Sequence, residues 1–240
     1  MTTLKTFHDE FYTSNILDLD ESGNDFSKIG SLWKEASGPL QVLDIGCGAG
    51  AVTAELVKRG HTVFGLDIQD EAIRRAKLRG LQARVADLNG PLPFEDRSID
   101  VVLAADIIEH LYDPAGLLRE IRRVLKDDGY AILAIPHHFD IIQRIRMLFG
   151  RGIVSAEHLH YSSDYKPWNY VHIRFFTLAE AQEIVRMSGF KIECLVQVGV
   201  PIFYPLPVRA PLRIGFNRLG RRLFPTLFSS GLRMRVRKAH

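Results

Sequence analysis

Residues 41–50 read QVLDIGCGAG, a short apolar run that ends in glycines, and they decide the fold class. The helix-like segment 51–59 follows directly, so the local order is strand, turn and helix. Glycines allow a tight turn and let the backbone approach a ligand that a Cβ would exclude. The helix that follows offers unpaired amide N–H groups in its first turn. This stretch therefore predicts a strand–turn–helix unit with a ligand-binding turn.

The same alternation continues as far as Pro136. Asp70 and Asp113 are the expected N-caps of a helix over 71–79 and of a helix that begins after Asp113. Further strands are expected at 61–66, 82–86, 99–104 and 130–135. Strands that alternate with helices form parallel sheets covered on both faces, so 38–136 is predicted to be a doubly wound α/β unit.

Beyond Pro136 the alternation gives way to a different pattern. An amphipathic helix is expected over 139–149, and the capping box formed by Thr177 and Glu180 predicts a second helix. The apolar residues that share one face of the first helix are Ile141, Ile145 and Leu148. Two more strands are expected, at 191–196 and at 232–237, where apolar residues alternate with arginines.

The predicted fold is α/β, with a doubly wound, mostly parallel, seven-stranded Rossmann-like sheet and helical lid insertions. With no internal repeat and no linker, we expect residues 1–240 to form one domain. Its expected parts are an N-terminal helical cap at 1–37, a cofactor-binding core at 38–136, a lid insertion at 137–171, and a C-terminal part of the sheet at 172–240 that carries a basic aromatic insertion at 201–231.

The charges are divided unevenly along the chain. It has 31 basic and 28 acidic residues, but 194–240 contains no Asp or Glu. The bases in that segment are Arg209, Arg213, Arg218, Arg221, Arg222, Arg233, Arg235, Arg237 and Lys238. Since these are nine, 1–193 holds 31 − 9 = 22 bases against 28 acids, and an acidic body of −6 carries a basic segment of +9.

Composition excludes several classes of protein. A hydrophobic content of 46% and a charged content of 25% exclude a disordered or fibrous chain. The longest uncharged stretch, 194–208, contains three prolines and is shorter than the roughly 20 residues of a spanning helix. Cys47 and Cys194 are far apart, and the first residues do not form an apolar signal segment. We therefore expect a reduced, cytoplasmic protein, with peripheral attachment to the inner face of a membrane left open.

An acidic residue at the end of the second strand is further evidence for a ligand site. Asp67 closes that strand, at the position where an acid in such a fold accepts hydrogen bonds from two ribose hydroxyls. Together with the glycine turn it predicts a nucleoside-containing ligand. Gly46, Gly48 and Ala51 also satisfy the relaxed dinucleotide fingerprint, so an NAD(P)-dependent oxidoreductase remains an alternative on this motif alone.

Two longer runs carry a family resemblance. Residues 42–68 read VLDIGCGAGAVTAELVKRGHTVFGLDI, and 84–136 read RVADLNGPLPFEDRSIDVVLAADIIEHLYDPAGLLREIRRVLKDDGYAILAIP. They closely resemble the class I S-adenosylmethionine-dependent methyltransferases, in the small-molecule branch that includes ubiquinone-type methyltransferases. The resemblance resumes weakly from His172 to Phe190 and implies S-adenosylmethionine as cofactor.

The resemblance also implies roles for individual residues. Asp44 and the glycines would border the methionine part of the cofactor, Asp67 would hold the ribose hydroxyls, and Asp87 would meet the adenine amino group. The full set of implied cofactor-binding residues is Asp44, Gly46, Cys47, Gly48, Gly50, Asp67, Ile68, Asp87, Leu88 and Ala105.

Histidines near the ends of two strands are the candidate general bases for an acceptor hydroxyl. They are His110, after the fourth strand, and His137 and His138, after the fifth. The pair is favoured, because an acid–histidine pair such as Glu109-His110 recurs in this family regardless of acceptor. Three other histidines match no metal-ligand spacing, so they are interpreted as surface or lid residues and no metal site is expected. These are His158, His160 and His172.

The insertion 201–231 mixes aromatic and aliphatic residues with arginines and contains no acid. We expect it to dock on an anionic membrane surface or to cover a small or lipid-linked acceptor. Packing of the insertion on its own domain is the alternative. A basic tail also suits RNA, so an RNA methyltransferase or nucleic-acid-binding protein stays open, although the acidic body disfavours it. A cofactor-binding pseudoenzyme and the oligomeric state are left open too.

Overall fold

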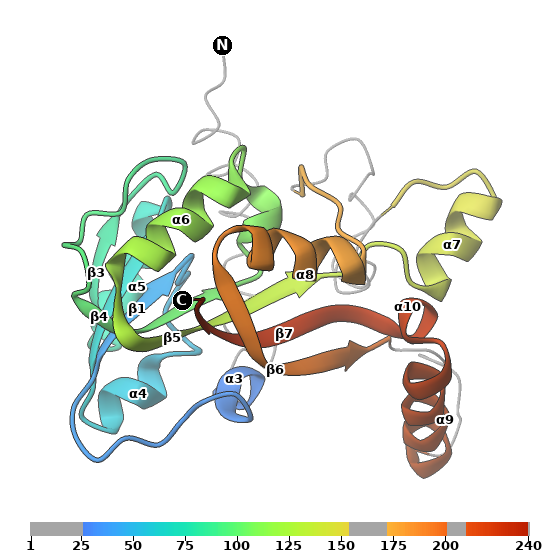
Figure 1. Ribbon diagram of the computed structural model, residues 1–240, viewed down its shortest axis with the longest axis horizontal. Coiled ribbons are helices and arrows are strands. Elements are labelled where there is room, and N and C mark those ends of the chain that lie inside the picture. Colours follow the sequence, from blue (N-terminus) through green and yellow to red (C-terminus); the bar gives the residue numbers. More distant parts are fainter. Residues whose placement is uncertain (1–25, 154–171, 201–209, 240) are drawn as a thin grey trace.

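A computed structural model describes residues 26–153, 172–200 and 210–239. They form one seven-stranded sheet in the order β3-β2-β1-β4-β5-β7-β6 (Figure 1). Its strands are β1 (Gln41–Ile45), β2 (Thr62–Asp67), β3 (Gln82–Val85), β4 (Ile99–Ala105), β5 (Leu125–Pro136), β6 (Phe190–Gly199) and β7 (Ser229–Lys238). β1 to β5 pair in parallel, whereas β7 is antiparallel to both of its neighbours. The predicted fold class is confirmed.

Helices cover both faces of the sheet. They are α3 (Ser27–Gly30), α4 (Ala54–Lys58), α5 (Asp70–Leu78), the 3-10 turn η1 (Ile108–His110), α6 (Pro114–Val124), α7 (Ile141–Leu148), α8 (Leu178–Met187), α9 (Ala210–Leu223) and α10 (Pro225–Phe228). Successive strand residues point into two separate hydrophobic cores, one on each face of the sheet. Val42 packs in the core that contains α4 and α5, and Leu43 packs in the core that contains α6 and α8. This period of two is what a doubly wound sheet requires.

Two of the three N-cap residues predicted for helices are confirmed. Asp113 caps α6 by accepting a hydrogen bond from the Gly116 amide at 2.8 Å. Thr177 and Glu180 make the reciprocal bonds of a capping box at α8. The predicted cap at Asp70 is wrong, because Asp70 is already helical and Gln69 occupies the N-cap without a side-chain hydrogen bond.

The C-terminal strand confirms its predicted alternation. Leu232, Met234 and Val236 are buried. Two of the intervening arginines, Arg235 and Arg237, form ion pairs with Glu193 on the neighbouring strand, and Lys238 pairs with Asp127. Much of the charge on β7 is therefore compensated by acids of the body.

Two regions outside the core add to what the sequence predicts. The helix α7 is confirmed, and on its predicted apolar face Ile145 and Leu148 are exposed whereas Ile141 is half-buried. The described part of the insertion 201–231 carries α9, α10 and the first residues of β7. The segments 1–25, 154–171 and 201–209, with most of the predicted cap and half of the lid, lie outside the described residues.

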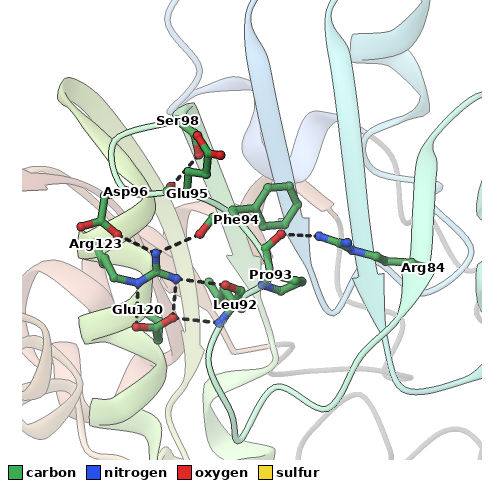
Figure 2. Close-up of polar contacts among 9 residues, drawn as sticks. All are labelled: Arg84, Leu92, Pro93, Phe94, Glu95, Asp96, Ser98, Glu120 and Arg123. Atoms are coloured by element: carbon green, nitrogen blue, oxygen red, sulfur yellow. Dashed lines mark hydrogen bonds and ion pairs between the residues drawn. The ribbon is translucent and has the colours of Figure 1, made fainter.

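A single arginine fixes the long loop between β3 and β4 (Figure 2). Arg123 on α6 donates to the carbonyl oxygens of Leu92 and Phe94, both at 2.9 Å, and pairs with Asp96 and Glu120 at 2.7 Å. Glu120 in turn accepts from the Leu92 amide at 2.8 Å. These contacts hold the loop against α6.

The sheet order locates the place where a ligand can enter. β2 and β3 extend from one side of β1, and β4 and β5 extend from the other, so the chain reverses direction across the sheet between β1 and β4. Open α/β sheets bind ligands outside the carboxyl ends of the strands at such a reversal. Among the described residues, no helix is long and apolar enough to cross a membrane.

Candidate functional site

The turn after β1 adopts the conformation that its glycines permit. Gly46, Gly48 and Gly50 all have positive φ, at 71°, 50° and 77°. A Cβ on Gly46 would lie 2.9 Å from Ile107 Cγ1, so this position packs against the segment that follows β4. A Cβ on Gly48 would meet nothing within 4 Å. The turn is thus closed on one side and open on the other.

Asp67 ties the end of β2 to this turn. Its carboxylate accepts hydrogen bonds from the Gly48 amide at 2.9 Å and from the Gln69 amide at 3.0 Å. The carboxylate is therefore held beside the open glycine, where the predicted ribose contact requires it. Because the two oxygens bond to different amides, their orientation is fixed before any ligand arrives.

Asp44 lies buried at the end of β1. It accepts a hydrogen bond from the Thr53 hydroxyl at 2.7 Å. Burial raises the pKa of its carboxyl to about 7; the Thr53 bond opposes this rise and the nearby Asp67 charge adds to it. A cationic ligand group beside Asp44 would favour the ionised form, which fits the predicted contact with an ammonium group.

The remaining predicted cofactor residues take different positions. The Cys47 side chain packs on Gly65 in the core, where burial raises the pKa of its thiol, so a cofactor contact would come from its backbone. Ile68 is half-buried and Leu88 is buried. Asp87 is exposed and accepts two hydrogen bonds from Asn89 at 2.9 Å. Ala105 is the last residue of β4, two residues before Ile107, which faces Gly46.

His137 bridges two backbone segments. Its Nδ1 lies 3.2 Å from the Phe176 carbonyl oxygen and its Nε2 lies 3.0 Å from the Thr226 carbonyl oxygen. Both ring nitrogens thus face carbonyls of the chain, which suits a structural link better than contact with an acceptor.

His138 points the other way, into a buried cluster. Its Nδ1 accepts from the Phe176 amide at 3.2 Å, and its Nε2 lies 2.8 Å from His172 Nδ1. Burial, followed by the charge of neighbouring His137, lowers the pKa of His138 to about 4. At neutral pH it is therefore a neutral ring that orients His172.

Sequence reasoning missed two members of this cluster, Glu109 and His172. Glu109 is fully buried, and its Oε1 lies 3.8 Å from His110 Nε2 and 3.7 Å from His172 Nε2. His172 had been interpreted as a surface or lid residue, but it is buried. The adjacent pair Glu109-His110 was the available signal, whereas nothing in the sequence places His172 beside it. His158 and His160 lie outside the described residues.

Backbone contacts bring the parts of the cluster together. The amides of Ile173 and Arg174 both donate to the Glu109 carbonyl oxygen at 3.0 Å. This joins the segment before α8 to η1, directly after β4. The glycine turn and the histidine cluster therefore lie at the same edge of the sheet, because Ile107 contacts Gly46 and belongs to the segment leading into η1.

Comparison with known proteins agrees with this geometry. A family described as a methyltransferase domain matches residues 43–133. The ubiquinone biosynthesis O-methyltransferase of Paracidovorax citrulli is 31% identical over 137 residues, which are 53% of this chain and 55% of that protein. The chain spans about half the length of the curated relatives it matches.

Solved structures share the whole fold at low identity. An S-adenosylmethionine-dependent methyltransferase from Thermotoga maritima superposes with a TM-score of 0.62 at 18% identity, over 98% of this chain and 97% of the other. The [4+2]-cyclase SpnF superposes with a TM-score of 0.63 at 18% identity, over 96% and 95%. Likeness at this identity shows the fold alone.

The fold and the glycine turn with Asp67 define a nucleoside-binding α/β protein of the doubly wound type. The match of residues 43–133 to a methyltransferase domain narrows this class, and the resemblance to the class I S-adenosylmethionine-dependent methyltransferases found in the sequence is confirmed. S-adenosylmethionine is the methyl donor of that family, and an oxidoreductase assignment is set aside.

Proposed function

We propose that this protein transfers a methyl group from S-adenosylmethionine to an oxygen atom of a small or lipid-like acceptor, by direct in-line displacement. The observation that carries the proposal is the shared edge of the sheet: the glycine turn with Asp67 on one side, and the buried cluster of Glu109, His110 and His172 on the other. The O-methyltransferase activity in the names of the curated relatives supports the choice of oxygen.

Methyl transfer from S-adenosylmethionine requires few catalytic groups from the protein. S-adenosylmethionine supplies, when bound, a methyl group already activated by a sulfonium. The chain has to align the acceptor oxygen with the methyl–sulfur bond, exclude water and assist loss of the hydroxyl proton. Asp44 and Asp67 would hold the donor, and the buried histidine cluster would face the acceptor hydroxyl. His110 and His172 suit this task better than His137, whose ring lies between backbone carbonyls.

The reaction can be tested with methyl-labelled S-adenosylmethionine. The acceptors would be a prenylated phenol or catechol, its short-chain water-soluble analogue, and total RNA. We expect label in the hydroxylated aromatic compounds and none in an Asp67→Ala control. Label in RNA, or transfer to amines but not to hydroxyls, would contradict the proposal.

The surface of α9 suggests where a lipid-like acceptor would come from. Phe216, Leu219 and Leu223 follow one another at helical spacing on one stripe, and each is about half exposed. The opposite side of the helix contacts the body through Asn217, which donates to the Val200 carbonyl oxygen at 3.2 Å. An amphipathic helix normally buries its apolar stripe, so an outward stripe indicates a docking surface.

A second helix adds to this surface. α10 contacts α7, and the three helices α7, α9 and α10 gather at one end of the molecule (Figure 1). α7 ends at Leu148, which is 79% exposed, and the C-cap residue Phe149 is 75% exposed. Among the described residues, no ion pair involves the arginines of these helices, Arg144, Arg146, Arg218, Arg221 and Arg222. Exposed apolar side chains beside unpaired arginines fit the interface of an anionic bilayer.

Sedimentation with liposomes tests this docking surface. We expect the full chain to sediment with phosphatidylglycerol-containing vesicles and much less with neutral vesicles, and the double variant Leu219→Ser, Leu223→Ser to remain in solution. Leu78→Ser on α5 is the matched control, because Leu78 is 76% exposed but lies in another helix. Equal partitioning to both vesicle types, no partitioning, or self-association through α9 would contradict docking on a membrane.

A further inference from the structure

A groove of about 830 Å³ runs between α6 and α8, which contact each other on one face of the sheet (Figure 1). It is lined by the outer stripe of each helix, by the segment that leads into α8 and by the turn that follows it. None of the residues that line it belongs to the glycine turn or to the histidine cluster. The groove is therefore a surface feature separate from the proposed site of methyl transfer.

The two sides of the groove carry opposite charges. Arg119 and Arg122 line it from α6, and Glu180 and Glu183 line it from α8. All four residues are exposed. Among the described residues, no ion pair joins these arginines to these glutamates, and Arg119 pairs with Asp113 at the start of its own helix. Each side thus offers charge to a group that enters the groove from outside.

Apolar side chains are exposed along the same groove. Met187, in the last turn of α8, is 80% exposed, and Phe175, before α8, is 41% exposed. Ile184 also lines the groove and is half-buried. Exposed apolar side chains bordered by charged ones are typical of protein interfaces, in which methionine and aromatic residues are enriched.

The two helices run in the same direction and cover the same length of the groove. Before them, Arg174 donates to the Tyr112 carbonyl oxygen at 2.6 Å, and at their far ends Arg122 donates to the Gly189 carbonyl oxygen at 3.2 Å. α6 has 11 residues and α8 has 10. Their middle turns therefore lie at the same level, on opposite sides of the groove.

We propose that the groove binds a second copy of this chain, with α8 of each copy seated in the groove of the other. A symmetric dimer uses one surface on both copies, so that surface has to be complementary to itself. A two-fold axis parallel to the helices meets this condition, because it keeps each turn at its level and brings α8 of one copy against α6 of the other. Glu183 of each copy then faces Arg119 of the other, and Met187 is covered.

The charge pattern favours a second copy over a small ligand. An anionic ligand would pair with the arginines but would be repelled by the glutamates, and a cationic ligand would meet the reverse. The surface of α6 and α8 itself carries both charges in the order that the groove requires. Because exposed ion pairs contribute little free energy, the apolar contacts supply most of the affinity, and the charges fix the orientation of the copies.

Analytical ultracentrifugation of the full chain over a range of concentrations tests the dimer. We expect a reversible equilibrium between monomer and dimer in the wild type. Arg119→Glu and Glu183→Arg should each raise the dissociation constant about tenfold or more, because each variant places like charges opposite each other twice in the dimer.

Two further samples make the test specific. An equimolar mixture of the Arg119→Glu and Glu183→Arg proteins should form a mixed dimer, and the double variant should dimerise as the wild type does, because both restore opposite charges at each contact. Loss of folding cannot produce this restoration. Lys77→Glu, on α5, is the matched control for charge reversal, since Lys77 is exposed and lies outside the groove.

The outcomes decide the inference without reference to methyl transfer. The α9 variant Leu219→Ser, Leu223→Ser should still dimerise, which separates this interface from association through α9. Wild-type protein that stays monomeric at every concentration would overturn the proposal. So would single variants that dimerise as the wild type does, or single variants that remain monomeric when they are mixed.

Discussion

The carboxyl edge of the sheet has two parts, a first edge at β1 and β2 and a second edge at β4 and β5, and these two parts are built in different ways. At the first edge, Asp44, the glycine turn and Asp67 come from one short stretch and are joined by local bonds. At the second, Glu109 and His110 meet His138 and His172, which come from separate segments joined by long-range backbone contacts. A donor site built locally can be shared by a whole family, whereas an acceptor site assembled from distant segments can vary between its members.

The largest expected effect is at the first edge. Asp67→Ala removes a charged acceptor for two ribose hydroxyls, and each such bond contributes about 1.5–3 kcal/mol. We expect affinity for S-adenosylhomocysteine to fall about 100-fold or more by calorimetry, while the variant remains folded. Unchanged affinity would refute the ribose assignment.

Next in size is Gly46→Ala, where the two edges touch. The substitution places a side chain at φ 71° and 2.9 Å from Ile107. We expect a loss of about 2–3 kcal/mol in the free energy of unfolding, measured with urea. Gly60→Ala is the control, since Gly60 has φ 86° and open space around it. This variant should lose only the free energy that comes from holding an alanine at positive φ. Equal losses in both variants would show that the two edges are not packed together.

A smaller effect is expected from Arg123→Ala, which frees the loop 92–98 on the donor side. Loss of hydrogen bonds to two carbonyl oxygens should cost about 1–2 kcal/mol, a fall of several degrees in melting temperature. Arg119→Ala, which within the chain breaks only an exposed pair with Asp113, should leave the melting temperature of dilute, monomeric protein nearly unchanged. A similar shift in both variants would contradict the anchoring role of Arg123.

The smallest effect concerns pH. The Asp44 carboxyl has a raised pKa of about 7, so it is largely neutral below that pH and ionised above it. Cofactor affinity should rise as the pH passes upward through 7, by up to about tenfold, and Asp44→Asn should flatten the profile. The folding stability of the protein without ligand should depend on pH in the opposite direction. Its free energy of unfolding should fall as the pH rises from 3.8, the ordinary pKa of an Asp carboxyl, toward 7, because Asp44 holds its proton more tightly in the folded state than in the unfolded state. Cofactor affinity independent of pH in the wild type would contradict the Asp44 contact.

The two edges also differ in how far the sequence predicts them. The glycine turn, Asp67 and the capping box at Thr177 are signals within a few residues, and all three were located correctly. The proximity of His172 to Glu109 depends on how the segment before α8 pairs with η1, which no local pattern encodes. The exposure of Ile145 and Leu148 on α7 could not be predicted for the same reason, because periodicity identifies an apolar stripe but not what covers it.

The central claim is that the carboxyl edge at β1 and β2 binds S-adenosylmethionine. Calorimetric titration of the full chain with S-adenosylhomocysteine and, separately, with NAD⁺ tests it most directly. The account predicts one S-adenosylhomocysteine per chain, binding abolished or greatly weakened by Asp67→Ala, and no binding of NAD⁺. Binding of NAD⁺ without S-adenosylhomocysteine, or binding of neither, would contradict it.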